Sequence, residues 1–323
     1  MIIAGLLTTV LSKAQPELPV VLWHGMGGSS QGKGMANLTL TLEDILPSNT
    51  FVHSIRIGDS EETDRSKSFF DSLDRQVDEV CQQLKAIPEL NSSEAINALG
   101  FSQGGLFLRA YVQRCVDGPK IHRLITFGSP HAGVSDAPGC QQENNRKHPA
   151  SASRNCQMMR SIINAGVYLS WVQHSVVQAQ YFKKWSDYPT YIQKSAFLAE
   201  INLERESSHG DEYKSQLSSL DKLVLVRFEQ DEMVVPRDTA WFSFFDAQGV
   251  LQPIEKQPYY EKLGLHKTSI EFVSLPGDHM RIAHAELVSL VKWYFLGVRD
   301  VDLPTIVESG RVNNAFVEKQ EIW

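Results

Sequence analysis

The sequence contains no run of about 18 apolar residues, so we predict that no helix spans a membrane. Basic residues do not cluster either: 31 Lys and Arg are set against 38 Asp and Glu, giving a net charge of −7 with histidine neutral. Nucleic acids and anionic membranes are therefore poor partners for this chain. Cysteine is scarce, with four residues and no C-x-x-C pair, which argues against a metal site or thioredoxin-like redox chemistry.

The composition is that of a globular protein. Of the 323 residues, 42% are hydrophobic and 21% are charged. This is enough apolar material for a packed core, which argues against a disordered or low-complexity chain. The chain is also too long for a small scaffold held by disulfides. At about 150 residues per domain, the length fits two domains or one large α/β domain with an insertion.

The amino-terminal segment has features of a secretory signal. An apolar run, Ile2 to Leu11, is followed by Ser12-Lys13-Ala14, whose small residues fit cleavage after Ala14, although basic residues before the run are missing. We therefore interpret residues 1–14 as a signal peptide. Asn37 and Asn91 begin N-x-S/T triplets, which are compatible with N-glycosylation on the secretory pathway. There, four cysteines can form two disulfides, with three possible pairings.

Short apolar runs rich in β-branched residues alternate with segments of helical periodicity. Helices are predicted over Ser66 to Leu84, where apolar residues recur every three or four positions, and over Gly104 to Cys115. This alternation predicts an α/β fold, with a mostly parallel sheet covered by helices on both faces. The predicted strands are Pro19–Trp23, Phe51–Ile57, Ala95–Leu99, His122–Phe127, Leu223–Phe228 and Ile270–Leu275.

One region interrupts the alternation. Gly139 to Cys156 is polar and rich in asparagine, and Gln157 to Trp185 then carries large apolar side chains that we interpret as a helix. No further strand is predicted before Leu223. We interpret residues 139–217 as a helical insertion over the sheet, although an additional helical layer of the core would give the same pattern.

Gly100-Phe101-Ser102-Gln103-Gly104 matches G-x-S-x-G, the pattern of a nucleophile elbow. Such an elbow places its serine on a tight turn between the end of a strand and the start of a helix. Ser102 has a predicted strand directly before it and a predicted helix directly after it. A second match, centred on Ser30, lies in a Gly/Ser-rich loop beyond the first strand. Ser102 is therefore the candidate nucleophile.

A catalytic serine needs a histidine base and an acid that orients it. In doubly wound hydrolases the chain order is Ser, then Asp or Glu, then His, each at the carboxyl end of a strand. Asp231 follows the predicted strand ending at Phe228, and His279 follows the strand ending at Leu275. We predict these two as acid and base. Their rivals are Glu229, Glu232 and Asp238 for the acid, and His284 for the base.

The developing oxyanion needs hydrogen-bond donors. The residue after the nucleophile, Gln103, offers its backbone N–H at a helix start. The second donor usually comes from the loop after an early strand, and His24-Gly25-Met26-Gly27 is the candidate loop. We predict the N–H of Met26 as that donor. The glycines of this loop could instead mark a simple turn.

With these residues placed, the chain resembles the lysosomal palmitoyl-protein thioesterases, from about Leu18 to Leu296. The stretches that carry the resemblance are Trp23-His24-Gly25-Met26-Gly27, Gly100-Phe101-Ser102-Gln103-Gly104-Gly105, Phe107-Leu108-Arg109-Ala110, Gln113-Arg114-Cys115, Tyr181-Phe182, Phe197-Leu198-Ala199-Glu200-Ile201-Asn202, Trp241-Phe242 and Gly277-Asp278-His279.

The resemblance implies an α/β-hydrolase domain over residues 15–297 whose helical insertion forms the groove for a fatty acyl chain. It implies hydrolysis of long-chain acyl thioesters on cysteines of proteins or peptides, in lysosomes and without a cofactor. By matching position, Ser102, Asp231 and His279 would form the triad, with Met26 and Gln103 as oxyanion donors. The family's pairing would join Cys81 to Cys115 and Cys140 to Cys156.

Two features depart from the family pattern. Members carry an adjacent cysteine pair after the His-Gly-Met-Gly loop, where this chain has Ser29-Ser30-Gln31, so a bridge that would stiffen the loop is missing. The chain also continues as a polar tail, Val298 to Trp323, to which the sequence assigns no function. The alternatives are a lipase or carboxylesterase of the same fold, and a lipid-binding protein without activity, which is expected to have lost a triad member.

Overall fold

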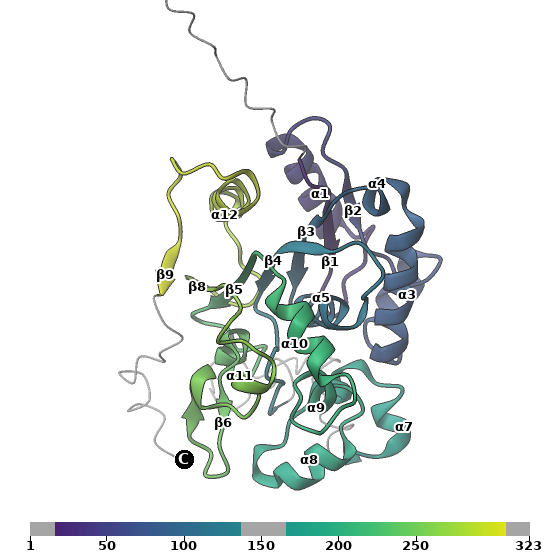
Figure 1. Ribbon diagram of the computed structural model, residues 1–323, viewed down its shortest axis with the longest axis vertical. Helices are drawn as coiled ribbons and strands as arrows, with labels where there is room; N and C mark the ends of the chain where they lie inside the picture. The colour runs from purple at the N-terminus through teal and green to yellow at the C-terminus, as the bar shows by residue number, and fades with distance from the viewer. Residues whose placement is uncertain (1–16, 137–165, 308–323) are drawn as a thin grey trace, which may run out of the picture.

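The computed structural model describes residues 17–136 and 166–307, which are built around a seven-stranded sheet (Figure 1). The strand order is β2-β1-β3-β4-β5-β8-β9, and all neighbouring pairs are parallel except β8 with β9. The predicted α/β architecture is confirmed. The strands are β1 (Val20–Trp23), β2 (Val52–Ser54), β3 (Ile96–Phe101), β4 (Ile121–Phe127), β5 (Lys222–Phe228), β8 (Ile270–Leu275) and β9 (Thr305–Val307).

Helices cover both faces of the sheet, and β1 shows why. Val20 and Leu22 belong to one apolar cluster, which includes α1 and α12, whereas Val21 and Trp23 belong to the other, with α3 and α5. Alternate residues of a strand point to opposite faces, so a strand buried on both sides is apolar throughout. The helices of these layers are α1 (Lys33–Ile45), α2 (Glu61–Lys67), α3 (Leu73–Ala86), α4 (Pro88–Asn91), α5 (Gln103–Arg114) and α12 (His284–Leu296).

The single helix predicted over Ser66 to Leu84 is wrong at its amino-terminal end. The chain forms α2, breaks at residues 68–72, and continues as α3. The side chain of Gln180 bonds to two backbone groups that the break frees: its Nε2 donates to the carbonyl of Asp71, and its Oε1 accepts from the N–H of Leu73. Because these partners lie about a hundred residues along the chain, apolar periodicity could not reveal the break.

The helix predicted over Gln157 to Trp185 is also wrong in its described part. Residues 167–187 contain one turn of α-helix, α7 (Ser170–Gln173), and two short 3₁₀ helices, Val177–Tyr181 and Trp185–Asp187. The side chain of Gln173 donates to two backbone carbonyls, those of Val167 and Ala179. The N–H of Val177 donates to the carbonyl of Phe69 at 2.9 Å, so contacts with the body also take the place of regular helical bonds in this segment. Further on lie α8 (Tyr188–Lys194), α9 (Leu198–Ile201) and α10 (Gly210–Ser218).

The region between β5 and β8 contains further short elements. They are the 3₁₀ helices Arg237–Trp241 and Ile254–Lys256, the antiparallel pair β6 (Phe244–Phe245) and β7 (Leu251–Gln252), and α11 (Tyr259–Lys262). After α12 the tail returns to the sheet, where β9 pairs with the free edge of β8. This is a role that sequence inspection did not assign to the tail. No helix in the described ranges is long and apolar enough to cross a membrane.

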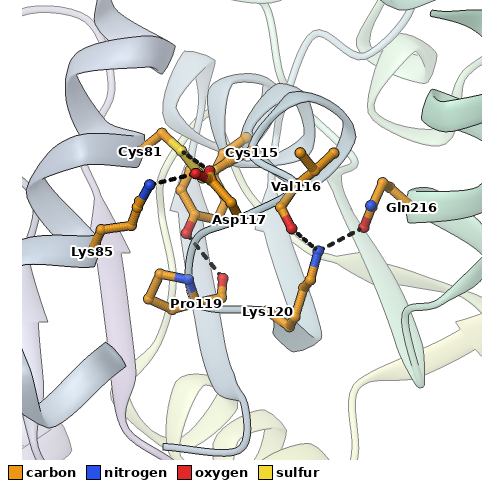
Figure 2. The surroundings of a disulfide bond; sticks show 9 residues. Cys81, Lys85, Cys115, Val116, Asp117, Pro119, Lys120 and Gln216 are labelled. Carbon is orange, nitrogen blue, oxygen red and sulfur yellow. Dashed lines mark hydrogen bonds and ion pairs between the residues drawn. A yellow bond between two sulfur atoms is a disulfide. The ribbon is translucent and has the colours of Figure 1, made fainter. Parts of the chain in front are cut away.

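One of the two disulfides implied by the family resemblance is present. Cys81 of α3 is bonded to Cys115, the residue directly after α5 (Figure 2). Lys85, one turn further along α3, forms an ion pair with Asp117 beside the bridge. The bridge therefore ties α3 to the helix that begins after Ser102. The second implied pair, Cys140 and Cys156, lies outside the described residues.

We expect loss of this disulfide to lower the free energy of unfolding by about 4 kcal/mol, since it closes a loop of 34 residues. The measurement is urea unfolding of the protein and of the double variant Cys81→Ser, Cys115→Ser. Lys85→Gln is the matched control: it removes the neighbouring ion pair, which is solvent-exposed, and should change stability little. Equal stability of the double variant and the parent would contradict the prediction.

Candidate active site

Ser102 occupies the turn where β3 ends and α5 begins. Its φ of 53° lies in the left-handed region, which costs a non-glycine residue about 1–3 kcal/mol. The flanking glycines make the turn possible. A Cβ on Gly100 would lie 2.3 Å from the Cα of Gly105, and a Cβ on Gly104 would lie 2.3 Å from the Trp23 carbonyl oxygen. The two glycines of the G-x-S-x-G motif are therefore required because the start of α5 lies in close contact with the ends of β1 and β3.

The structure brings Ser102, His279 and Asp231 together. His279 Nε2 lies 3.0 Å from Ser102 Oγ, and His279 Nδ1 lies 2.6 Å from Asp231 Oδ2. The acid follows β5 and the histidine follows β8, two neighbouring strands whose carboxyl ends lie at the same edge of the sheet. Asp231 Oδ1 accepts from the N–H groups of Met233 and Val234, at 2.9 and 3.0 Å. These bonds fix the carboxylate and leave Oδ2 for the histidine.

The rival acids have other surroundings. Asp238 forms an ion pair with Arg227. Glu229 accepts a hydrogen bond from the hydroxyl of Ser274 at 3.1 Å. Glu232, next to Asp231 in the same loop, is exposed to solvent. The carboxylate that meets His279 in this structure is therefore the one expected from its place after the strand.

The rival histidine and serine are also separate from this contact. His284 is the exposed first residue of α12 and lines the same cavity as Ser102. Ser30 lies in the loop before α1, and its N–H donates to Asp64 Oδ2 at 2.7 Å. The second G-x-S-x-G match thus lies in a loop whose backbone is held by a neighbouring helix.

The loop after β1 lies directly against the nucleophile turn. A Cβ on Gly25 would be 2.9 Å from the Cβ of Ser102, so this position has no room for a side chain. The N–H of Gly27 donates to Ser68 Oγ at 2.8 Å. Met26, the predicted oxyanion donor, lies between these two glycines and lines the cavity beside Ser102.

Gln103, the second predicted donor, is the first residue of α5, so its N–H has no acceptor within the helix. Its side chain is fully engaged. Nε2 donates to the carbonyl of Ser68 at 3.0 Å, and Oε1 accepts from the hydroxyl of Tyr181 at 3.0 Å. Burial raises the pKa of Tyr181, so its hydroxyl stays protonated as a donor. These contacts hold the start of the helix against α2 and the insertion.

A cavity of about 630 Å³ opens beside Ser102, within the usual size range of ligand pockets. It extends between α1 and the start of α12. Within the described part of the insertion, Tyr181 is the residue that lines it. A second cavity of about 540 Å³ lies within the insertion, around Val167, Tyr168 and Trp185. The apolar lining of the first includes Met26, Met35, Leu38, Phe101, Val134, Met233, Val234, Met280, Ile282 and Leu287.

Sequence inspection did not single out Asp64 and Ser68, which hold the loop after β1. Both lie at α2, whose seven residues include no apolar side chain, so hydrophobic periodicity could not detect the helix. The feature that could have revealed this helix is its first turn, which forms a capping box. The hydroxyl of Ser60 accepts from the N–H of Thr63, and the hydroxyl of Thr63 accepts from the N–H of Ser60.

Comparison with known proteins shows which chains this one is similar to. The chain is 37% identical to palmitoyl-protein thioesterase 1 of Caenorhabditis elegans, over 90% of this chain and 95% of that one. It is 34% identical to a palmitoyl-protein thioesterase–dolichyl pyrophosphate phosphatase fusion of Schizosaccharomyces pombe, over 93% of this chain and 47% of that one. It is 27% identical to a lysosomal thioesterase homologue of Drosophila melanogaster, over 80% of this chain and 82% of that one.

The match is not confined to individual relatives. Residues 19–279 fit the model of the family described as palmitoyl protein thioesterase, a range from just before β1 to the histidine that meets Ser102. This range contains the six parallel strands, the nucleophile turn and the insertion. The chain therefore belongs to the palmitoyl protein thioesterase family and is a thioester hydrolase with the α/β-hydrolase fold.

Proposed function

We propose that this protein hydrolyses long-chain fatty acyl thioesters, such as palmitoyl groups on cysteines of proteins or peptides, with Ser102 as nucleophile. The observation that carries the proposal is the chain of contacts from Ser102 Oγ through the His279 ring to Asp231 Oδ2, at 3.0 and 2.6 Å. A serine hydroxyl is a weak nucleophile until a positioned base accepts its proton. These distances supply such a base and an acid that orients it.

The reaction proceeds by acyl transfer in two steps. His279 Nε2 takes the proton of Ser102, whose Oγ attacks the thioester carbonyl. The backbone N–H groups of Met26 and Gln103 receive the negative charge that develops on the carbonyl oxygen. The thiol then departs with the proton from His279. Water, activated by the same histidine, adds to the acyl-enzyme and releases the fatty acid and the free serine.

The apolar cavity beside Ser102 is the proposed binding site for the acyl chain. Each methylene transferred from water into such a lining contributes about 0.8 kcal/mol to binding. The expectation that the insertion forms the acyl groove stays a prediction. In its described part the insertion contributes Tyr181 to this cavity and encloses the second one.

We infer that the protein enters the secretory pathway and acts in lysosomes. The Cys81–Cys115 bridge supports this, since disulfides persist in oxidising compartments. Asn37 and Asn91 are exposed, as glycosylation sites must be. The Drosophila relative is named as a lysosomal thioesterase. The proposed signal peptide, residues 1–14, lies outside the described residues.

The proposed function is tested with two matched peptides, one carrying S-palmitoyl cysteine and the other O-palmitoyl serine. We expect kcat/KM to be at least about tenfold higher for the thioester, because a thiol of pKa about 8.5 is a better leaving group than an alcohol and depends less on proton transfer from His279. Shorter acyl chains should lower kcat/KM steadily. Preference for the oxygen ester would favour a lipase or carboxylesterase, and acyl binding without hydrolysis would favour a lipid-binding protein.

A further inference from the structure

Asp64, on α2, is completely buried and faces the loop that carries Met26. Its Oδ1 accepts from His24 Nε2 at 3.0 Å and from the N–H of Ile57 at 2.9 Å, and its Oδ2 accepts from the N–H of Ser30 at 2.7 Å. Burial by itself raises the pKa of this carboxyl, but the hydrogen bond and charge of His24 and the two backbone donors outweigh it and lower the pKa. The Asp64 carboxylate is thus charged and held in place beside the loop that carries Met26.

His24 connects the Asp64 carboxylate to the peptide bond that carries the proposed oxyanion donor. Its Nδ1 lies 2.9 Å from the carbonyl oxygen of Gly25, while its Nε2 faces Asp64. Each ring nitrogen faces an acceptor, an arrangement in which a ring with a proton on each nitrogen donates one hydrogen bond to each. The Gly25 carbonyl also accepts from the N–H of Gly28 at 3.1 Å. In a planar trans peptide the N–H points opposite to the carbonyl, so fixing the Gly25 oxygen fixes the N–H of Met26.

We propose that Asp64 is a positioning residue for the oxyanion hole, acting through His24 and the Gly25 carbonyl to orient the Met26 N–H. This inference rests on the proposed function, because Met26 matters only if an oxyanion forms at Ser102. The contacts form a continuous series. The Asp64 carboxylate bonds to the His24 ring, the ring contacts the Gly25 carbonyl, and that carbonyl shares a peptide plane with the Met26 N–H. Asp64 touches no substrate and is not a catalytic residue.

Two further contacts extend the same support. Ser68, one turn after Asp64, accepts from the N–H of Gly27, so both peptides that flank Met26 are held from α2. The carbonyl of Ser68 accepts from the side chain of Gln103, whose N–H is the other proposed donor. Asp64 also holds Ser30, in the segment where the resemblance leads one to expect a cysteine pair. Hydrogen bonds to Asp64 and Ser68 therefore hold this loop on both sides of Met26.

The test compares Asp64→Asn with the unchanged full-length protein. Asparagine carries no charge to match a ring that donates from both nitrogens, so His24 keeps a single N–H, which the amide oxygen accepts from Nε2. Nδ1 then has no proton to donate, and the Gly25 carbonyl loses one of its two hydrogen bonds and keeps the one from Gly28. Removal of one oxyanion donor costs about 10²–10³ in kcat, and a misdirected donor should cost about 10–100-fold, with KM within about twofold. A hexadecyl trifluoromethyl ketone, whose adduct with Ser102 places an oxyanion in the hole, should lose affinity by the same factor. A palmitoyl-like thioether peptide, which forms no oxyanion, should bind as before.

Glu62→Gln is the matched control, an exposed acid on the same helix, and should leave all three quantities unchanged. His24→Gln provides a second test if Asp64→Asn does not fold, because its amide can still donate to Asp64 but not to Gly25. A folded variant with unchanged kcat and ketone affinity would overturn the inference, as would equal weakening of the ketone and the thioether. Failure of the unchanged protein to hydrolyse thioester or bind the ketone would instead overturn the proposed function.

Discussion

Replacing Ser102 with alanine is expected to lower kcat for palmitoyl-thioester hydrolysis by about 10⁵–10⁶-fold, the scale measured when a serine nucleophile is removed. The loss has this size because the hydroxyl forms the acyl-enzyme bond itself, and alanine leaves His279 with no proton to accept. The cavity lining is untouched, so binding of a non-hydrolysable palmitoyl thioether should change less than about twofold. Single-turnover kinetics and equilibrium binding give the two quantities.

Ser102→Gly separates lost chemistry from lost folding. Glycine adopts the φ of 53° without the strain that serine and alanine share at this turn. We therefore expect this variant to be inactive and yet more stable than the parent by about 1 kcal/mol in urea unfolding. Hydrolysis by either variant at more than about a thousandth of the parent rate would mean that another residue is the nucleophile.

Asp231→Asn is expected to lower kcat by about 10⁴-fold, or about 5 kcal/mol in the activation barrier, with little change in structure. The hydrogen-bond geometry gives the reason. The side-chain oxygen of asparagine can still accept from the N–H groups of Met233 and Val234, which places its NH₂ group opposite His279 Nδ1. Nδ1 must then be an acceptor, so the proton moves to Nε2, and the ring can no longer accept a proton from Ser102.

Glu232→Gln is the matched control for this prediction, since it neutralises an adjacent, exposed acid in the same loop. Its kcat should stay within about twofold of the parent. The check is a pair of pH–rate profiles together with unfolding curves for both variants. If Glu232→Gln lost as much activity as Asp231→Asn, the assignment of the orienting acid to Asp231 would be wrong.

The active-site contacts could be predicted because each residue carries a local signal. The strands before Ser102, Asp231 and His279 are short and mostly apolar, and each ends at a turn. Parallel strands bring their carboxyl ends to one edge of the sheet, so residues far apart in sequence meet there. The glycines at positions 100 and 104 could be read in the same way, because only glycine permits the close approach that the elbow requires.

The supports of the site could not be predicted in this way. Helix α2 has no apolar side chain, so nothing in its sequence indicates that Asp64 is buried or that it meets His24. The break between α2 and α3 depends on Gln180, and the irregular backbone of residues 174–187 depends on contacts with the body of the protein. Such contacts join segments separated by tens of residues or more, and single-sequence patterns report only neighbours within a few turns.

The sequence by itself determined the parallel sheet, the helices that cover it, and the order of Ser102, Asp231 and His279 along the chain. These depend on periodicity and on turn residues, which act over short distances. Only the tertiary structure decided how the loop around Met26 is held, how the insertion packs, and that the tail supplies an edge strand beside β8. The physical reason is that a buried polar group or an unpaired strand edge must be satisfied, and its partner is whichever segment the fold brings within reach.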